Sequence, residues 1–175
     1  MRKALFLDRD GVINQDLKYV HKIEDFVFNS DIFKICKFFL DREYLIFVIT
    51  NQAGIARGYY SLDDFKILDS FMIEEFKKRD ITVTKTYFCP HHPDFTKECE
   101  CRKPKPKMLF DAESEFDLDL KNSVLIGDKP SDIEAGVNAN LKYNFLVKSV
   151  YDLKDEHFNS LNDLFKFLKD RDDSF

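Results

Sequence analysis

The chain has 175 residues with 44% hydrophobic and 34% charged side chains, which suits one domain over residues 1–175 and excludes collagen-like, low-complexity and disordered chains. Its formal net charge of −5 argues against nonspecific binding to nucleic acid, which requires a basic surface. The longest apolar runs, at 45–49 and 124–126, are too short to cross a bilayer, and residues 1–7 are too few for a signal peptide, so we expect a cytoplasmic protein that does not bind membranes.

Strands and helices alternate in the predicted structure. A short apolar strand at 4–7 is followed by a helix at 32–40, whose apolar residues recur at helical spacing, and by a buried strand at 45–50. Ser61 with Asp64 three residues later is typical of a helix N-terminus. The remaining predicted elements are strands at 84–88, 123–126 and 145–147, and helices at 65–76, 108–116, 133–139 and after Ser160. This alternation predicts an α/β fold with a doubly wound parallel sheet.

Acidic side chains follow two of these strands. Asp8 and Asp10 follow the first strand, and continued strand geometry would point both carboxylates to one face, whereas the alternative is a turn into Gly11. Asp128 follows the strand at 123–126. Ligands bind such sheets beyond the carboxyl ends of the strands, and carboxylates from two strand ends suit Mg²⁺. The sequence therefore predicts a magnesium site at this edge.

Groups that suit phosphate oxygens follow other elements. Thr50 supplies a hydroxyl at the end of the second strand, and Arg102 and Lys103 supply adjacent cations. Four segments in chain order resemble the motifs of the haloacid-dehalogenase (HAD) phosphohydrolase superfamily: FLDRDG at 6–11, VITN at 48–51, the lysine of CRKP at 101–104, and IGDKPSD at 126–132. The resemblance covers residues 4 to about 147 and implies a HAD-like Rossmannoid fold. The gap from Asp10 to Thr50 leaves no room for a large cap domain.

This resemblance implies a role for each motif. Asp8 would be the nucleophile that forms an aspartyl-phosphate, and Asp10 would protonate the leaving oxygen and then deprotonate the attacking water. Mg²⁺ would be held by the Asp8 carboxylate, the backbone carbonyl of Asp10, and Asp128. Thr50 and Lys103 would stabilise the phosphoryl oxygens.

Cysteines and histidines gather between residues 89 and 101. Cys89, Cys99 and Cys101 with one histidine form a Cys₃His set, which is common in structural Zn²⁺ sites and would order a loop that has little apolar content. His91 and His92 are adjacent, and the spacing does not choose between them. The alternative is a group of free cysteines beside a chance histidine.

The loop sequence CPHHP at 89–93, followed by CECRKPKP at 99–106, is similar to that of the D-glycero-D-manno-heptose 1,7-bisphosphate 7-phosphatases, as is NQAGIARG at 51–58. In that family the zinc ligands fall on Cys89, His91, Cys99 and Cys101. The implied substrate contacts lie at 16–19 and 50–53 and at Arg102, Lys103 and Lys129. Among them we single out Asp16, Tyr19, Asn51, Arg102 and Lys129. The implied substrate is a small sugar phosphate on the route to nucleotide-activated heptose for lipopolysaccharide or capsule. The chain departs from the family pattern at Leu17-Lys18 and at Lys107, so the sequence does not specify the anomer.

Two alternative functions stay open. A histidinol-phosphate phosphatase shares the four motifs and a similar zinc loop, although GIARG at 54–58 fits the heptose branch better. A catalytically idle zinc module is the alternative of another class, against which the intact acids and Lys103 weigh. We expect a monomer with an open site. His21 and His157 lie outside every motif, and we expect both at the surface.

Overall fold

The computed structural model describes residues 1–147 and 157–175. In this part of the chain six strands form one sheet in the order β3-β2-β1-β4-β5-β6, and every neighbouring pair is parallel. The strands are β1 (Ala4–Leu7), β2 (Leu45–Asn51), β3 (Val83–Cys89), β4 (Val124–Gly127), β5 (Tyr143–Val147) and β6 (His157–Phe158). The predicted doubly wound parallel sheet is therefore confirmed.

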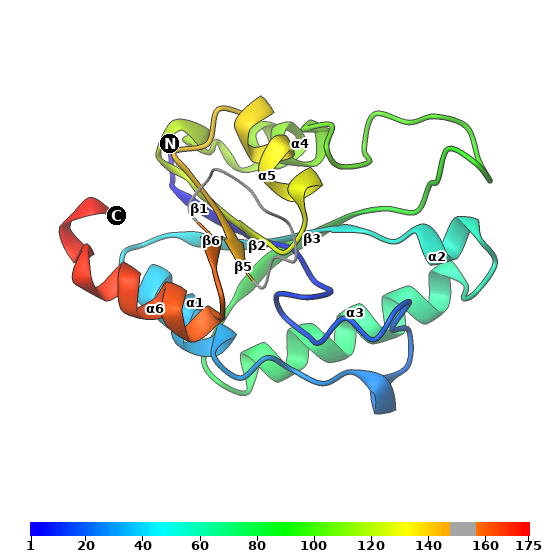
Figure 1. The fold of residues 1–175 in the computed structure, drawn as a ribbon, viewed down its shortest axis with the longest axis horizontal. Helices are drawn as coiled ribbons and strands as arrows, with labels where there is room; N and C mark the ends of the chain where they lie inside the picture. The colour runs from blue at the N-terminus through cyan, green and yellow to red at the C-terminus, as the bar shows by residue number, and fades with distance from the viewer. Residues whose placement is uncertain (148–156) are drawn as a thin grey trace.

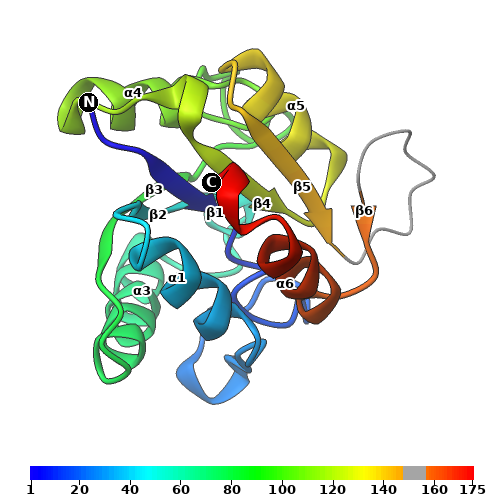
Figure 2. The ribbon, with the colours of Figure 1, turned by 90° about the vertical axis from the view of Figure 1, so that its left-hand side faces the viewer.

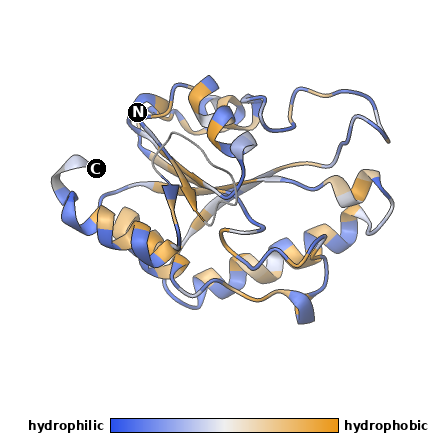
Figure 3. Ribbon diagram, viewed as in Figure 1, coloured by the Kyte–Doolittle hydropathy of each residue, from blue (hydrophilic) through white to orange (hydrophobic). Residues whose placement is uncertain are grey.

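Helices cover both faces of the sheet (Figures 1 and 2). One layer contains α1 (Ile32–Leu40), α3 (Leu62–Lys77) and α6 (Leu161–Asp170), and the other contains α4 (Lys107–Phe116) and α5 (Pro130–Asn138). Successive strand residues point to opposite faces, so Leu5 and Leu7 pack in the core of the first layer and Ala4 and Phe6 in that of the second. Figure 3 shows apolar and polar bands alternating along the helices, as expected when one helix side faces a sheet.

Local sequence explains where α3 begins. The Ser61 hydroxyl accepts a hydrogen bond from the Asp64 backbone N–H at 3.1 Å, and the Asp64 carboxylate accepts one from the Ser61 backbone N–H at 2.8 Å. This reciprocal capping box confirms the predicted helix start. The sequence prediction omitted the short elements, which are α2 (Ala53–Ala56), β6, and the 3-10 helices η1 (Ile23–Asp25), η2 (Leu120–Asn122) and η3 (Asp172–Ser174).

The connections place several loops at one edge of the sheet. Between β1 and β2 the chain forms a loop, η1 and α1, and so lacks a large cap domain, as predicted. Because the strands are parallel, the residues that follow β1, β2, β3 and β4 all lie at the carboxyl edge, where α2 and the long loop after β3 also lie (Figure 1). None of the helices in the described ranges has the length and apolar character needed to span a membrane.

Candidate functional site

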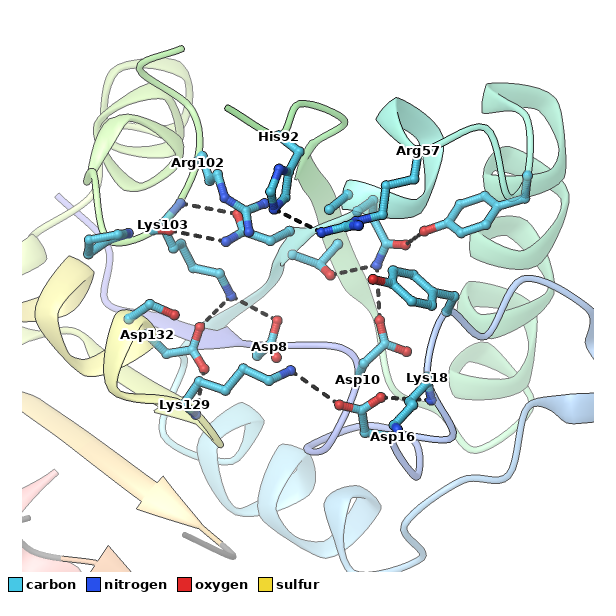
Figure 4. Close-up of a pocket in the computed structure, with 18 residues that line it drawn as sticks. Asp8, Asp10, Asp16, Lys18, Arg57, His92, Arg102, Lys103, Lys129 and Asp132 are labelled. Carbon is cyan, nitrogen blue, oxygen red and sulfur yellow. Dashed lines mark hydrogen bonds and ion pairs between the residues drawn. The ribbon is translucent and has the colours of Figure 1, made fainter. Parts of the chain in front are cut away.

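A pocket of about 840 Å³ lies at the carboxyl edge of the sheet. Figure 4 shows its side chains converging from the loop after β1, from the end of β2 and α2, from the loop after β3, and from the start of α5. The nine residues singled out as catalytic or as substrate contacts all line it, namely Asp8, Asp10, Asp16, Tyr19, Thr50, Asn51, Arg102, Lys103 and Lys129. The fold thus brings together residues that are up to 121 positions apart in the chain.

The base of the pocket is a buried ion network centred on Lys103. Its ammonium nitrogen lies 2.8 Å from a carboxylate oxygen of Asp8 and 2.7 Å from one of Asp132, and it donates to the Ile49 carbonyl at 2.8 Å. Burial raises the pKa of Asp8, although Lys103 opposes that effect. Burial by itself would lower the pKa of Lys103, but the two carboxylates outweigh it and the pKa lies above its ordinary value.

Three carboxylates form a cluster beside this lysine. Oxygen atoms of Asp8, Asp128 and Asp132 lie within 4.8 Å of one another. Burial and the nearby Asp8 raise the pKa of Asp128 to about 8, and its buried Oδ1 atom has no hydrogen-bond partner among the described residues. A buried, unpartnered carboxylate oxygen beside a second carboxylate fits a divalent cation, which would supply the missing positive charge. The residues present therefore fit the predicted magnesium ion.

Gly11 allows this cluster to be compact. Its φ of +99° lies in a region that other residues rarely adopt, and a Cβ atom at this position would collide with the carboxylate of Asp128. Asp132 arranges the facing loop, since its Oδ2 atom accepts hydrogen bonds from the backbone N–H groups of Asp128 at 3.1 Å and Lys129 at 3.0 Å. Sequence reasoning noted Asp132 without assigning it to the site. Its signal was its place in the first turn of the helix after Asp128.

Asp10 reaches the pocket by a turn and not by continued strand geometry. The strand ends at Leu7 as predicted, and hydrogen bonds close a turn from Arg9 to Asn14, so the structure has the turn alternative and not continued strand geometry. The Asp10 carboxylate accepts hydrogen bonds from the buried Arg9 guanidinium at 2.9 Å, from the Asn14 amide at 3.0 Å and from the Gln52 amide at 3.0 Å. Three side chains therefore fix this carboxylate.

The end of β2 supplies Thr50 and Asn51. The Thr50 hydroxyl is buried at the pocket wall, where it accepts a hydrogen bond from the Gln52 amide at 2.8 Å. The Asn51 side chain donates to the Lys103 carbonyl at 3.1 Å and accepts from the Lys103 backbone N–H at 3.1 Å. Asn51 thus ties the loop after β3 to the end of β2 and places the Lys103 side chain in the pocket.

Cationic side chains surround the pocket mouth. Lys129 pairs with Asp16 at 3.2 Å, and Arg102 donates to the His91 carbonyl at 3.2 Å. Lys18 and Arg57 also line the pocket. Lys18 falls within the implied contact stretch 16–19, whereas sequence reasoning did not assign Arg57. The signal for Arg57 was the GIARG segment, which was noted only as a family feature. Its guanidinium lies 3.2 Å from the His92 ring and 4.6 Å from the centre of the Phe95 ring.

The loop after β3 brings four possible metal-ligand atoms together, three sulfurs and one imidazole nitrogen. Ligand atoms of Cys89, His91, Cys99 and Cys101 lie within 4.8 Å of one another. The Cys101 sulfur is 3.0 Å from the Cys89 sulfur and 3.4 Å from the His91 Nδ1 atom. Three thiols and one imidazole are a donor set that fits structural zinc. His92, by contrast, faces the pocket, so the structure groups His91 and not its neighbour with the cysteines.

His21 has contacts that the sequence did not suggest. It is partly buried, its ring stacks on that of Tyr60 with 5.1 Å between centroids, and its Nδ1 atom lies 2.8 Å from the Tyr19 carbonyl oxygen. His21 lies at the surface as expected, but it packs on Tyr60, which the sequence did not suggest. The expectation of a surface position is also confirmed for His157, which is exposed.

The amino-acid sequence is similar to those of known phosphatases. Residues 100–163 match the model of a HAD-hydrolase-like family. The chain is 52% identical to a D-glycero-alpha-D-manno-heptose-1,7-bisphosphate 7-phosphatase of Campylobacter jejuni, over 97% of this chain and 98% of that protein. It is 47% identical to a D-glycero-beta-D-manno-heptose-1,7-bisphosphate 7-phosphatase of Helicobacter pylori, over 83% of each chain.

The fold is also similar to a solved structure. The crystal structure of a D,D-heptose 1,7-bisphosphate phosphatase from B. bronchiseptica, complexed with magnesium and phosphate, superposes with a TM-score of 0.83 and 25% identity. The similarity covers 96% of this chain and 98% of the other. Sequence and fold therefore point to the same group of phosphatases.

Proposed function

The chain belongs to the D-glycero-D-manno-heptose-1,7-bisphosphate 7-phosphatase family of HAD-like hydrolases, and we propose that it removes the 7-phosphate of that sugar bisphosphate through an aspartyl-phosphate intermediate. The observation that carries the proposal is the buried Asp8 carboxylate, held 2.8 Å from Lys103 at the base of a pocket with a cationic mouth. A buried nucleophile beside a cation suits an anionic phosphate, and further cations at the mouth suit a second one.

The reaction assigned to these residues has two steps. In the first, an Asp8 oxygen attacks phosphorus, the bond from phosphorus to the sugar oxygen breaks, and Asp10 gives its proton to that oxygen. In the second, water attacks the phosphorus of the aspartyl-phosphate, Asp10 takes the water proton, and the phosphorus–Asp8 bond breaks. Phosphate leaves, Asp8 is again a carboxylate, and Asp10 is again protonated. Thr50 and Lys103 contact the phosphoryl oxygens as charge redistributes.

Mg²⁺ would be held by Asp8, Asp128 and the backbone carbonyl of Asp10, and it would reduce the repulsion between the anionic nucleophile and the anionic substrate. The raised pKa of Asp128, about 8, and its unpartnered Oδ1 atom among the described residues support this proposal. Asp132 has a different part, since its two oxygens are used by Lys103 and by the backbone after β4. We therefore assign Asp132 to positioning and not to magnesium.

The second phosphate of the substrate would be held at the pocket mouth. Arg102 is anchored by the His91 carbonyl and Lys129 by Asp16, so both cations are held in place before substrate arrives. Asp16 and Tyr19, on the loop after β1, would contact the sugar hydroxyl groups. Lys18, in the Leu17-Lys18 departure from the family pattern, adds a further cation at this mouth.

Zinc would have a structural part. All four positions of a tetrahedral ion would be filled by Cys89, His91, Cys99 and Cys101, which leaves none for substrate. The ion would order the loop that carries Arg102 and Lys103.

We propose further that the protein acts as a cytoplasmic monomer with one domain over residues 1–175, in the synthesis of nucleotide-activated heptose.

The test compares substrates directly. Purified protein with Mg²⁺ is assayed with the α and β anomers of heptose 1,7-bisphosphate and with histidinol phosphate. We expect kcat/KM for one anomer to exceed that for histidinol phosphate at least about 100-fold, because histidinol phosphate brings a cationic amine to a cationic mouth. A preference for histidinol phosphate would overturn the proposal, and so would the absence of phosphatase activity.

A further inference from the structure

The Gln52 amide links the Asp10 carboxylate to a tyrosine outside the four motifs. Gln52 is 1% exposed, and its Nε2 group donates to Asp10 at 3.0 Å and to the Thr50 hydroxyl at 2.8 Å. Its Oε1 atom accepts a hydrogen bond from the Tyr60 hydroxyl at 2.5 Å. Every polar atom of the Gln52 amide is thus used.

The surroundings of Tyr60 hold its ring in one place. Its ring fills the space above Gly54, where a Cβ atom would collide with it, and the His21 ring stacks on it at 5.1 Å. Burial raises the pKa of Tyr60 to about 12, so the hydroxyl keeps its proton at neutral pH. The Tyr60 hydroxyl therefore remains a hydrogen-bond donor to Gln52 at neutral pH.

The direction of the Gln52 amide matters for Asp10. The Asp10 Oδ2 atom accepts a hydrogen bond from Gln52, so it is stabilised by the Nε2 group and would be repelled by the Oε1 atom. The Tyr60 hydroxyl donates its hydrogen bond to Oε1, so the amide is oriented with its Nε2 group toward Asp10. Without that donor Oε1 is buried without a partner, and the amide is free to rotate away from this orientation.

We propose that Tyr60 is a positioning residue that acts through Gln52 to hold Asp10 in place for proton transfer to the leaving oxygen. The inference rests on the proposed role of Asp10 as proton donor. It differs from a role of Tyr60 in packing alone, because only the hydroxyl is needed for it. Leaving groups that need a proton should therefore depend on Tyr60 more than those that do not.

The experiment compares two substrates in the Tyr60→Phe variant, which keeps the ring and removes the hydroxyl. We expect kcat/KM for heptose 1,7-bisphosphate to fall about 5- to 20-fold, because the sugar alkoxide must be protonated as it leaves. The value for 4-nitrophenyl phosphate should change less than about 2-fold, because 4-nitrophenolate leaves without a proton. The matched control is Tyr59→Phe, which removes the hydroxyl of a tyrosine that is 55% exposed and should leave both values unchanged.

A double variant tests the path through Gln52. In a Gln52→Leu background, Tyr60→Phe should lower kcat/KM for the sugar substrate by less than about 2-fold, because the link to Asp10 is already broken. The proposal is overturned by equal losses on both substrates, by no loss on the sugar substrate, or by the full loss in the Gln52→Leu background. If wild-type protein hydrolyses 4-nitrophenyl phosphate but not the heptose bisphosphate, the proposed function fails separately. The Tyr60 comparison then uses another sugar phosphate that wild-type protein hydrolyses.

Discussion

Asp132 holds the ammonium nitrogen of Lys103 at 2.7 Å, with both side chains almost fully buried. The other oxygen of Asp132 accepts hydrogen bonds from the backbone after β4, next to Asp128. One carboxylate therefore fixes both the lysine at the base of the pocket and the loop that carries an acid of the proposed magnesium site.

The first prediction follows from this pair. Asp132→Asn keeps a side-chain oxygen that can accept hydrogen bonds from the backbone N–H groups of the loop after β4. It removes the buried negative charge that pairs with Lys103. We expect a loss of about 3 kcal/mol in the free energy of unfolding and at least about a 10-fold fall in kcat. Chemical denaturation and steady-state kinetics measure both. Asp111→Asn, which breaks an exposed pair with Lys107, is the control and should change neither. Unchanged kcat in Asp132→Asn would contradict the assigned role of Asp132 in positioning Lys103.

The second prediction concerns the nucleophile. Asp8→Asn should abolish turnover, because an amide does not form the acyl-phosphate, whereas Asp10→Asn should lower kcat at least about 100-fold because the leaving oxygen is no longer protonated. Steady-state assays measure both, and circular dichroism checks the fold. Near-normal kcat in Asp8→Asn with bound Mg²⁺ would contradict the assigned mechanism.

The third prediction separates the two cations after Cys101. Lys103 is buried against Asp8 and Arg102 is partly exposed, so Arg102→Ala should lower kcat/KM for the bisphosphate about 10- to 100-fold and spare a simple monophosphate. Lys103→Ala should lower the values for both substrates. The comparison uses heptose bisphosphate and 4-nitrophenyl phosphate. Equal losses on both substrates in Arg102→Ala would remove the distinction.

The fourth prediction concerns zinc. Purified protein should contain about one zinc ion per chain, separate from exchangeable Mg²⁺. His91→Ala should lose it, and activity should fall because the loop with Arg102 and Lys103 loses its order. His92→Ala should retain it, because that ring faces Arg57 and not the cysteines. Elemental analysis of the three proteins measures this. A fully active wild-type preparation without zinc would show that the cysteines are not a metal site.

Most of the fold was predictable from local sequence. Apolar runs and the Ser61 capping box correctly predicted five strands and the long helices, because each signal is local. The omitted elements are too short for periodicity to register, as in the four residues of α2 and the two of β6. Strand β1 ends at Leu7 as predicted, and of the two alternatives for Asp8 to Asp10 the structure has the turn, which runs from Arg9 to Asn14.

The meeting of the site residues at one edge was predictable, because ligands bind parallel sheets beyond the carboxyl ends of the strands. The hydrogen bonds between individual site residues were not predictable in this way. Asp8 and Asp128 follow strand ends and Thr50 lies in the last two residues of β2, so the three meet at one edge for that reason. The contacts of Asp10 with Asn14 and Gln52 depend on the turn after β1 and on α2, for which the sequence has no periodic signal. His91 and His92 are chemically identical neighbours, and only the path of the folded loop separates them.

The most direct test of the central claim is ³¹P NMR of heptose 1,7-bisphosphate during turnover with Mg²⁺. The account predicts that the 7-phosphate signal disappears, the 1-phosphate signal remains, and inorganic phosphate appears in equal amount. Loss of the 1-phosphate signal, or no consumption by protein that hydrolyses 4-nitrophenyl phosphate, would contradict it.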